Sequence, residues 1–426
     1  MIDRRIFLKQ MLGSAFLFSS YLASAKPNLS PKQPEIPFQG EPDWEAVRKL
    51  FPLTYNRVYF NNGTMGPSPL VVLAQQKQAL EEIEVLGDYN LKHQVREHLA
   101  SLLHAEKEEI ALTHNTTEAI NIVCWGLKLK AKDEVIVTNH EHVGNGLPWL
   151  NRARVDKIQV KYFELGKTAE ETFHNLKKTV TSRTKVLAIP HITCTNGQVL
   201  PIKEICEWAK ARNIYTSIDG AHAPGMMPVD VKQLGCDFYA GCGHKWLLGP
   251  KGTGFLYVSK EHLEKNTLQP YFVGAYSDCG WEINVPKPIL KGYNPTAQRY
   301  DYGTQNPALY QGLETAIEFL QKLGLDKIQA RNHTLANYLQ EGLLNLQLPH
   351  LEMLTPQEAQ SRAAMITFKI KGTEALAFAK IASENCFRIR IVPEHGLNAI
   401  RVSTSIYNDF YEIDNFLMMV KENFTK

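Results

Sequence analysis

The fold of this chain is decided by the stretch Asp237-Phe238-Tyr239-Ala240-Gly241-Cys242-Gly243-His244-Lys245-Trp246. It places one lysine directly behind a short apolar run and a pair of glycines. A glycine-rich segment follows at 249–254, and a second apolar run follows at 255–258. Apolar runs separated by glycine and proline are typical of strands joined by tight loops. We therefore predict a strand, a loop and a second strand, with the Lys245 amine held at the loop.

A lysine in such a loop can act as a Schiff-base nucleophile when its surroundings lower the pKa of the amine. A lone loop lysine is more often simply solvated. Upstream, however, the apolar run 214–218 leads directly into Asp219. An acid at the end of a buried parallel strand stands where α/β proteins bind ligands. Pyridoxal phosphate (PLP) chemistry needs a lysine for the cofactor aldehyde and an acid for the pyridinium nitrogen, so Asp219 and Lys245 together predict this cofactor.

With these segments the chain resembles the class V aminotransferases, a family of fold type I PLP-dependent enzymes that includes cysteine desulfurases and isopenicillin N epimerase-like proteins. The resemblance covers residues 55–415 and rests on Asp219 and Gly243-His244-Lys245 at strand ends. It implies an α/β fold with a large PLP-binding domain and a smaller α+β C-terminal domain. The large domain would hold a mixed, mostly parallel seven-stranded sheet flanked by helices. We place the large domain at 43–310 and the small domain at 311–426, with 43–60 able to pack with the small domain.

Composition excludes several classes of protein. The 426 residues can bury a large core, and 47 Lys and Arg against 44 Asp and Glu leave a formal charge of +3. Because the charge is nearly balanced and no long basic block occurs, we expect no nucleic-acid partner. No apolar run long enough to span a membrane follows the first thirty residues, so we expect no membrane span in the mature protein. The 7 cysteines lack metal-ligand spacing, and we expect mostly buried thiols.

The N-terminus resembles an export signal. Arg4-Arg5 precedes the apolar stretch 11–22 and then Ala23-Ser24-Ala25, the order of charged region, apolar region and cleavage site. The paired arginines resemble the twin-arginine signal. We expect a signal peptide at 1–25, a proline-rich linker at 26–42, and a periplasmic or otherwise exported protein. The alternatives are an amphipathic N-terminal helix or an uncleaved anchor, and a cytoplasmic protein if the signal is not functional.

Candidate phosphate contacts follow the apolar run 110–112. Either Thr116 or Thr117 can cap the next helix, whose free N–H groups suit a phosphate. A plain capping threonine is the alternative. The resemblance gives Thr117 the side-chain contact with the phosphate and Thr116 mainly a backbone contact.

A second junction follows the predicted strand 134–137 and carries Asn139-His140-Glu141-His142. The resemblance places His142 on the pyridine ring of the cofactor, where a flat side chain fixes the ring plane. The two histidines flank a glutamate but do not have the helical H-E-x-x-H spacing, so we expect no metal.

The remaining cofactor contacts follow from the resemblance. His222 stands where desulfurases have glutamine and can still hydrogen-bond the ring oxygen, although a loop histidine outside the site is the alternative. Cys242 replaces a serine and is a weaker donor, and His244 keeps an N–H for the phosphate. Thr304 matches a turn that contacts the phosphate of the partner subunit, which implies a homodimer with shared sites. In the loop 191–197 the asparagine of desulfurases is missing, and its cofactor contacts stay open.

Two residues are expected at the substrate. Asn62 lies in the glycine- and proline-rich loop 61–69, which lies near the substrate carboxylate in the resembled family, although a simple turn asparagine is an equal alternative. Arg401 matches the Arg-x-Ser…Tyr-Asn pattern near the end of family members and would hold the carboxylate through a bidentate fork.

The resemblance implies an enzyme acting at the α-carbon of an amino acid, with Lys245, Asp219 and His142 as its catalytic residues. We expect a transaminase or an epimerase, since the run 243–256 looks closer to isopenicillin N epimerase-like members. The loop 391–399 has no cysteine where desulfurases carry their nucleophile, which disfavours a cysteine desulfurase. A C–S lyase that eliminates a β-group from a sulfur-containing amine is one alternative. A PLP scaffold that binds without turnover is another.

Overall fold

The computed structural model describes residues 40–54, 56–87 and 94–424. The expected signal peptide and most of the expected linker lie outside these ranges, so their assignment stays a prediction. The described residues belong to one compact unit, 38–426. None of the helices in the described ranges is long and apolar enough to cross a membrane.

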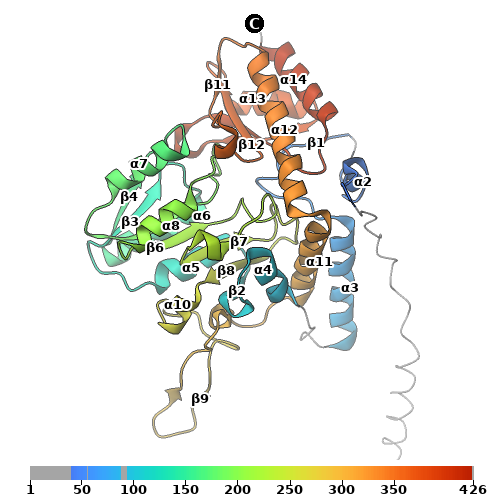
Figure 1. Ribbon diagram of the computed structural model, residues 1–426. Helices are drawn as coiled ribbons and strands as arrows, with labels where there is room; N and C mark the ends of the chain where they lie inside the picture. The colour runs from blue at the N-terminus through green and yellow to red at the C-terminus, as the bar shows by residue number, and fades with distance from the viewer. Residues whose placement is uncertain (1–39, 55, 88–93, 425–426) are drawn as a thin grey trace, which may run out of the picture. The chain divides into compact units, whose positions relative to one another are not determined.

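A mixed seven-stranded sheet forms the centre of the large domain, with strand order β2-β8-β7-β6-β5-β3-β4 (Figure 1). Its strands are β2 (Ile110–Thr113), β3 (Glu134–Thr138), β4 (Gln159–Phe163), β5 (Thr184–Pro190), β6 (Tyr215–Asp219), β7 (Phe238–Cys242) and β8 (Gly254–Val258). Only β8 runs antiparallel to its neighbours in this sheet. The expected fold class is therefore confirmed.

Helices between the strands cover the sheet, which explains why β2, β3, β7 and β8 are buried along their whole length. These helices are α5 (Thr116–Gly126), α6 (Val143–Asp156), α7 (Ala169–Thr179), α8 (Ile202–Lys210), α9 (Val231–Leu234) and α10 (Lys260–Glu264). Because β2, β3, β5, β6 and β7 run in the same direction, their carboxyl ends meet at one edge. Open α/β sheets bind their ligands at this edge.

The small domain holds a four-stranded antiparallel sheet of order β11-β12-β15-β14. Its strands are β11 (Leu351–Met353), β12 (Met365–Ile370), β14 (Arg390–Val392) and β15 (Ala399–Ser403), and its helices are α12 (Leu325–Asn345), α13 (Ala375–Glu384) and α14 (Phe410–Phe424). Phe60 is fully buried in the core of this domain. The strand β1 (Val58–Tyr59) pairs in parallel with β13 (Phe387–Arg388). The segment that precedes the loop 61–69 is thus attached to the small domain.

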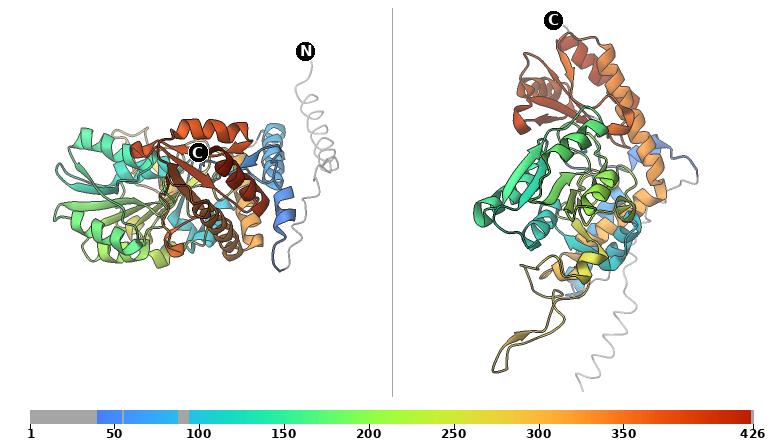
Figure 2. Two further views of the ribbon diagram at one scale, coloured as in Figure 1. Left: turned by 90° about the horizontal axis from the view of Figure 1, so that it is seen from above. Right: turned by 60° about the vertical axis from the view of Figure 1, so that its left-hand side comes forward.

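The remaining elements connect these parts. They are α2 (Trp44–Lys49), α3 (Leu70–Leu86), α4 (Val95–Leu103), α11 (Pro307–Leu323), the short strands β9 (Trp281–Glu282) and β10 (Ile289–Leu290), and the 3-10 helices η1 (Lys107–Glu109), η2 (Ala297–Tyr300), η3 (Ala359–Ser361) and η4 (Glu394–Gly396). The hairpin β9–β10 stands away from the rest of the large domain (Figure 2).

Two segments of the small-domain side divide into shorter elements. The helical region after residue 307 consists of α11 and α12, because Gly324, at a φ of +86°, separates them. Glycine adopts this conformation without the steric cost that a Cβ brings. The extended run 387–392 divides into β13 and β14, which pair with different partners. Helix α11 packs on α3 and α4, whereas α12 packs on α14. The domain boundary that we place near residue 310 stays a prediction.

Candidate active site

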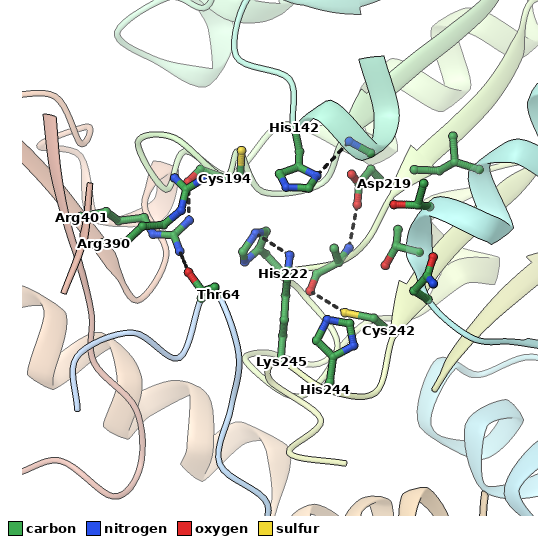
Figure 3. A pocket seen from close by; sticks show the side chains of 17 residues that line it. Thr64, His142, Cys194, Asp219, His222, Cys242, His244, Lys245, Arg390 and Arg401 are labelled. Carbon is green, nitrogen blue, oxygen red and sulfur yellow. Dashed lines mark hydrogen bonds between the residues drawn. The ribbon is translucent and has the colours of Figure 1, made fainter. Parts of the chain in front are cut away.

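A cavity of about 190 Å³ lies at the carboxyl edge of the seven-stranded sheet, facing the strands β14 and β15 (Figure 3). Its wall combines the loop 61–69, the ends of several large-domain strands and two arginines of the small domain. The lining residues are Gly63, Thr64, Asn115, Thr116, Thr117, Ile120, His142, Gly144, Cys194, Asp219, Ala221, His222, Cys242, His244, Lys245, Arg390 and Arg401.

Lys245 is held by a loop that closes on itself directly after β7. The N–H of Gly243 donates to the carbonyl of Thr253 over 2.9 Å, and the N–H of Gly249 donates to the carbonyl of Gly243 over 2.8 Å. A Cβ at Gly66 would lie 2.1 Å from the carbonyl oxygen of Lys245, so only glycine allows the loop 61–69 to approach this closely. The lysine backbone is therefore fixed, and its side chain points into the cavity (Figure 3).

His222 is the nearest polar partner of the lysine, with its Nε2 3.2 Å from the Lys245 Nζ. The indole N–H of Trp246 donates to the His222 Nδ1 over 3.3 Å. Burial, followed by the nearby charge of Lys245, lowers the pKa of His222 well below its usual value, so the ring is neutral. Because an indole nitrogen can only donate, the single ring proton of His222 sits on Nε2 and faces the cavity.

Asp219 is the last residue of β6 and lies at the other side of the cavity. One carboxylate oxygen accepts the N–H of Ala221 over 2.9 Å. The chain can turn away after this acid only because the next residue is Gly220, where a Cβ would lie 1.9 Å from the ring of Tyr239. The second oxygen remains for a ligand in the cavity.

The phosphate end of the cavity differs from the prediction in one respect. Neither Thr116 nor Thr117 caps α5, because Asn115 takes this role and accepts the N–H of Glu118 over 2.9 Å. Both threonines therefore lie in the first turn of the helix and line the cavity. The buried Thr116 Oγ1 has no hydrogen-bond partner in the described chain. A buried hydroxyl without a partner is costly, and it marks a place for a ligand oxygen.

His244 and Cys242 complete this end. The buried Nδ1 of His244 also finds no partner within the described residues, and burial lowers the pKa of His244 to about 4, so the ring is neutral. The thiol of Cys242 donates to the carbonyl of Ala221 over 3.7 Å. Free helix N–H groups, hydroxyls and a neutral imidazole suit a phosphate group. With Lys245 and Asp219, these residues fit PLP.

His142 lies above the cavity and caps α6. Its Nδ1 accepts the N–H of Gly144 over 3.0 Å, which fixes the ring. Burial and then Lys245 lower the pKa of His142. Behind it, the buried Glu141 accepts from Asn145 over 2.8 Å, and burial raises the pKa of Glu141 to about 8. A neutral, fixed imidazole is suited to stacking on a pyridine ring.

The opposite end of the cavity is cationic. The guanidinium of Arg401 donates to the carbonyl of Cys194 over 2.5 Å and to the Thr64 hydroxyl over 3.1 Å. It is 1% exposed, and its Nε has no partner in the described part of the chain. Arg390 is paired with Glu394. A buried guanidinium with only neutral partners is incompletely compensated, so Arg401 is the group best placed to bind a carboxylate.

The structure thus brings most of the predicted residues to one cavity. They are Thr116, Thr117, His142, Asp219, His222, Cys242, His244, Lys245 and Arg401. Two others lie elsewhere. Asn62 is buried outside the cavity wall and accepts from the Tyr407 hydroxyl over 3.0 Å, and its neighbours Gly63 and Thr64 line the wall instead. Thr304 is exposed, and its contact with a partner subunit stays a prediction.

Among the polar side chains that line the cavity, four were not predicted as ligand contacts: Thr64, Asn115, Cys194 and Arg390. Arg390 lies directly opposite Arg401 in the antiparallel pair β14–β15, so both side chains stand on the same face of the sheet. This register could not be obtained from the sequence. The only available signal was an arginine at an alternating position of an apolar run.

Comparison with known proteins finds similar sequences over most of the chain. Residues 85–416 match the family described as Aminotransferase class-V. A probable cysteine desulfurase from Xylella fastidiosa is 30% identical over 404 residues, covering 88% of this chain and 94% of that protein. The isopenicillin N epimerase of Streptomyces clavuligerus is 30% identical over 393 residues, covering 87% and 96%.

Solved structures resemble the chain over most of its length. The cystine C–S lyase C-DES, in complex with its reaction product cysteine persulfide, has a TM-score of 0.78 and 25% identity, covering 88% of this chain and 100% of that one. A mutant of C-DES carries glycine covalently linked to the PLP cofactor and has a TM-score of 0.78 and 26% identity. Since desulfurases recur among the relatives, the comparisons do not support the expectation that disfavours a cysteine desulfurase.

Proposed function

Since this chain belongs to the class V aminotransferase family and uses pyridoxal phosphate as its cofactor, we propose that it breaks the C–S bond of a sulfur-containing amino acid by β-elimination. The relatives support cleavage of a C–S bond, because they include probable cysteine desulfurases and a cystine C–S lyase. The proposal differs from the desulfurase reaction in one respect. The sulfur leaves as a free thiol, or as a free persulfide when the substrate is a disulfide, and is not handed to a cysteine of the protein.

The observation that carries this proposal is the state of the thiols at the cavity. In the described chain, the cysteines that line it are Cys194 and Cys242. Burial raises the pKa of both thiols, that of Cys194 to about 11. A thiolate is the nucleophile in persulfide formation, and both groups are protonated at neutral pH. The loop 391–399 at the rim adds no cysteine.

The residues of the cavity have distinct roles in this reaction. PLP, when bound, supplies an electron sink that makes the Cα–H bond of the substrate acidic. Asp219 would pair with the protonated ring nitrogen, and Thr116, Thr117 and His244 would hold the phosphate. Arg401 would bind the substrate carboxylate.

The Lys245 amine is the base that takes the Cα proton. As the proton leaves, the Cβ–S bond breaks and its electron pair departs with the sulfur, which becomes a thiol after taking up a proton. One water then hydrolyses the three-carbon remainder, so substrate and water yield thiol, pyruvate and ammonia. His222 faces Lys245 with its Nε2–H and positions the Lys245 amine.

Product analysis tests this proposal. The purified holoenzyme would be incubated with L-cystine and with L-cysteine, and pyruvate, ammonia, alanine and sulfur products would be measured. We expect pyruvate and ammonia in equal amounts. Formation of alanine with a protein-bound persulfide would contradict the proposal and identify a desulfurase.

Epimerisation at Cα is a second candidate, favoured by the similarity to isopenicillin N epimerase. It is the reaction expected from the sequence, together with transamination. An epimerase would release the D-isomer and exchange the Cα hydrogen with solvent without forming pyruvate. A transaminase would form pyruvate or another keto acid only when an acceptor is present.

We further propose that the active form is an exported homodimer. Thr304 is exposed, as are Tyr271 and Phe272 nearby, which suits a surface that a second copy covers. Light scattering of the purified protein tests the dimer, and fractionation of cells that make the full chain tests the export.

A further inference from the structure

A groove of about 650 Å³ adjoins the active-site cavity and shares His142 with it. The floor of the groove is the segment 137–142, and α6, β4 and η4 form its sides. A second connection runs through an ion pair, since Arg390 lines the cavity and its partner Glu394 lines the groove. The groove therefore borders the site along His142 and this ion pair.

Space in the cavity itself is limited. Its volume of about 190 Å³ is below the roughly 300–1,000 Å³ that is typical of ligand pockets, and the cofactor must occupy much of it. Arg401 would hold the substrate carboxylate at one wall. A long substituent on the β-carbon then has to leave the cavity, and the adjoining groove past His142 offers the room.

The groove is apolar where a substituent would lie. Val143, Leu147 and Leu150 are 58%, 58% and 54% exposed, and their spacing places them on one face of α6. Tyr162 of β4 is 64% exposed and lines the groove as well. Contiguous exposed apolar side chains mark binding sites on soluble proteins.

The charged groups around the groove are mostly compensated. Lys161 pairs with Glu134 over 2.9 Å, and Glu394 pairs with Arg390. The Nδ1 of His140 shares a hydrogen bond with the Thr195 hydroxyl over 2.6 Å. Burial lowers the pKa of His140 to about 4, so the His140 ring is neutral. Glu164 is exposed at the groove. An uncharged ligand fits these surroundings, and an anionic one does not.

We propose that this groove receives the sulfur substituent of a cysteine S-conjugate, and that the substituent is an uncharged apolar or aromatic group. The substrate is then larger than cysteine, and Leu147 and Leu150 determine specificity. This inference rests on the proposed C–S cleavage. The bond broken is the same Cβ–S bond, and the apolar group departs with its sulfur as a thiol.

Binding is tested separately from cleavage, so that the two failures can be told apart. L-2-Amino-5-phenylpentanoic acid has the shape of S-benzyl-L-cysteine but no sulfur to lose. Its binding to the holoenzyme would be followed by the absorbance of the cofactor and compared with that of L-alanine. We expect at least about tenfold tighter binding of the phenyl compound, on the order of one buried apolar group. Equal binding would overturn the inference even if cysteine conjugates are cleaved.

Variants locate the binding in the groove. Leu147→Glu should lower kcat/KM for S-benzyl-L-cysteine about tenfold or more, with S-methyl-L-cysteine changed less than about twofold. Val155→Glu is the matched control, because Val155 is equally exposed (57%) on the same helix but lies outside the groove, and it should change neither value. A parallel loss for both substrates in Leu147→Glu would contradict the inference. If the phenyl compound binds tightly but S-benzyl-L-cysteine yields no pyruvate, the proposed function fails and this substrate class fails with it.

Discussion

The two ends of the cavity are built in different ways. At the cofactor end, Thr116, Asp219 and Lys245 lie at or just after the ends of three strands of one sheet, and each lies in a short local motif. At the substrate end, Thr64 and Arg401 come from segments more than three hundred residues apart in sequence and meet over 3.1 Å. One edge of the sheet therefore fixes the cofactor contacts, whereas the substrate contacts depend on how the small domain packs.

This difference has a consequence for substitutions. A change at the cofactor end should affect every substrate alike, because each substrate reacts with the same bound cofactor. A change at the substrate end should alter KM and the preference between substrates.

The largest effect is expected for Lys245→Ala, which should lower kcat by at least about a thousandfold with every amino acid tested, because the base at Cα is lost. Borohydride reduction should attach the cofactor to the wild-type chain at this residue and not to the variant. Lys260→Ala, at an exposed lysine after β8, is the control and should behave like the wild type. A variant that retains substantial turnover would show that another group is the base.

Next in size is Arg401→Gln, expected to raise KM about a hundredfold while kcat falls much less. Removing one partner of a buried charge pair costs about 2–5 kcal/mol. Arg401→Lys keeps the positive charge but loses the two-pronged guanidinium, so its KM should lie between those of the wild type and Arg401→Gln. Amines without a carboxylate provide the check, since their turnover should not depend on Arg401. If Arg401→Gln lowers the turnover of such amines as much as that of amino acids, Arg401 acts on the cofactor and not on the substrate carboxylate.

The cofactor end of the cavity could be predicted from the sequence better than the substrate end. Lys245 and Asp219 were predictable because each stands in a motif at a strand end, and the parallel strands bring such ends together. The capping role of Asn115 was missed because three neighbouring polar residues can all cap, and only the extended backbone of Asn115, with a φ of −171°, selects it. Arg390 was missed because its position depends on the register of β14 against β15.

A moderate effect is expected at His222. Replacement by alanine should lower kcat about tenfold, because the Nε2–H that faces Lys245 is removed, and His222→Gln should recover most of the loss since its amide also donates. Burial holds the pKa of His222 well below its usual value, so the ring is neutral around neutral pH and takes up a proton only in more acidic solution. The pH profiles of the wild type and His222→Gln between pH 6 and 8 should therefore have the same shape. If the wild-type activity changes with a midpoint near pH 6.5 and this change is absent from His222→Gln, the ring of His222 is not neutral as we infer.

The smallest effect is expected for Thr64→Ala. The Thr64 hydroxyl contributes one hydrogen bond to Arg401, and one such bond is worth about 0.5–1.5 kcal/mol. We expect KM for amino acids to rise about three- to tenfold, with kcat unchanged. Thr64→Ser should restore the wild-type KM. If kcat falls and KM is unchanged, the loop 61–69 belongs to the cofactor end.

The most direct test of the central claim is the product balance of the double variant Cys194→Ser/Cys242→Ser. If no thiol of the cavity takes part in breaking the C–S bond, the variant should release pyruvate and the sulfur product within about threefold of the wild-type rate. Loss of sulfur release in the variant, together with a persulfide on Cys194 or Cys242 of the wild type by mass spectrometry, would contradict elimination to a free thiol.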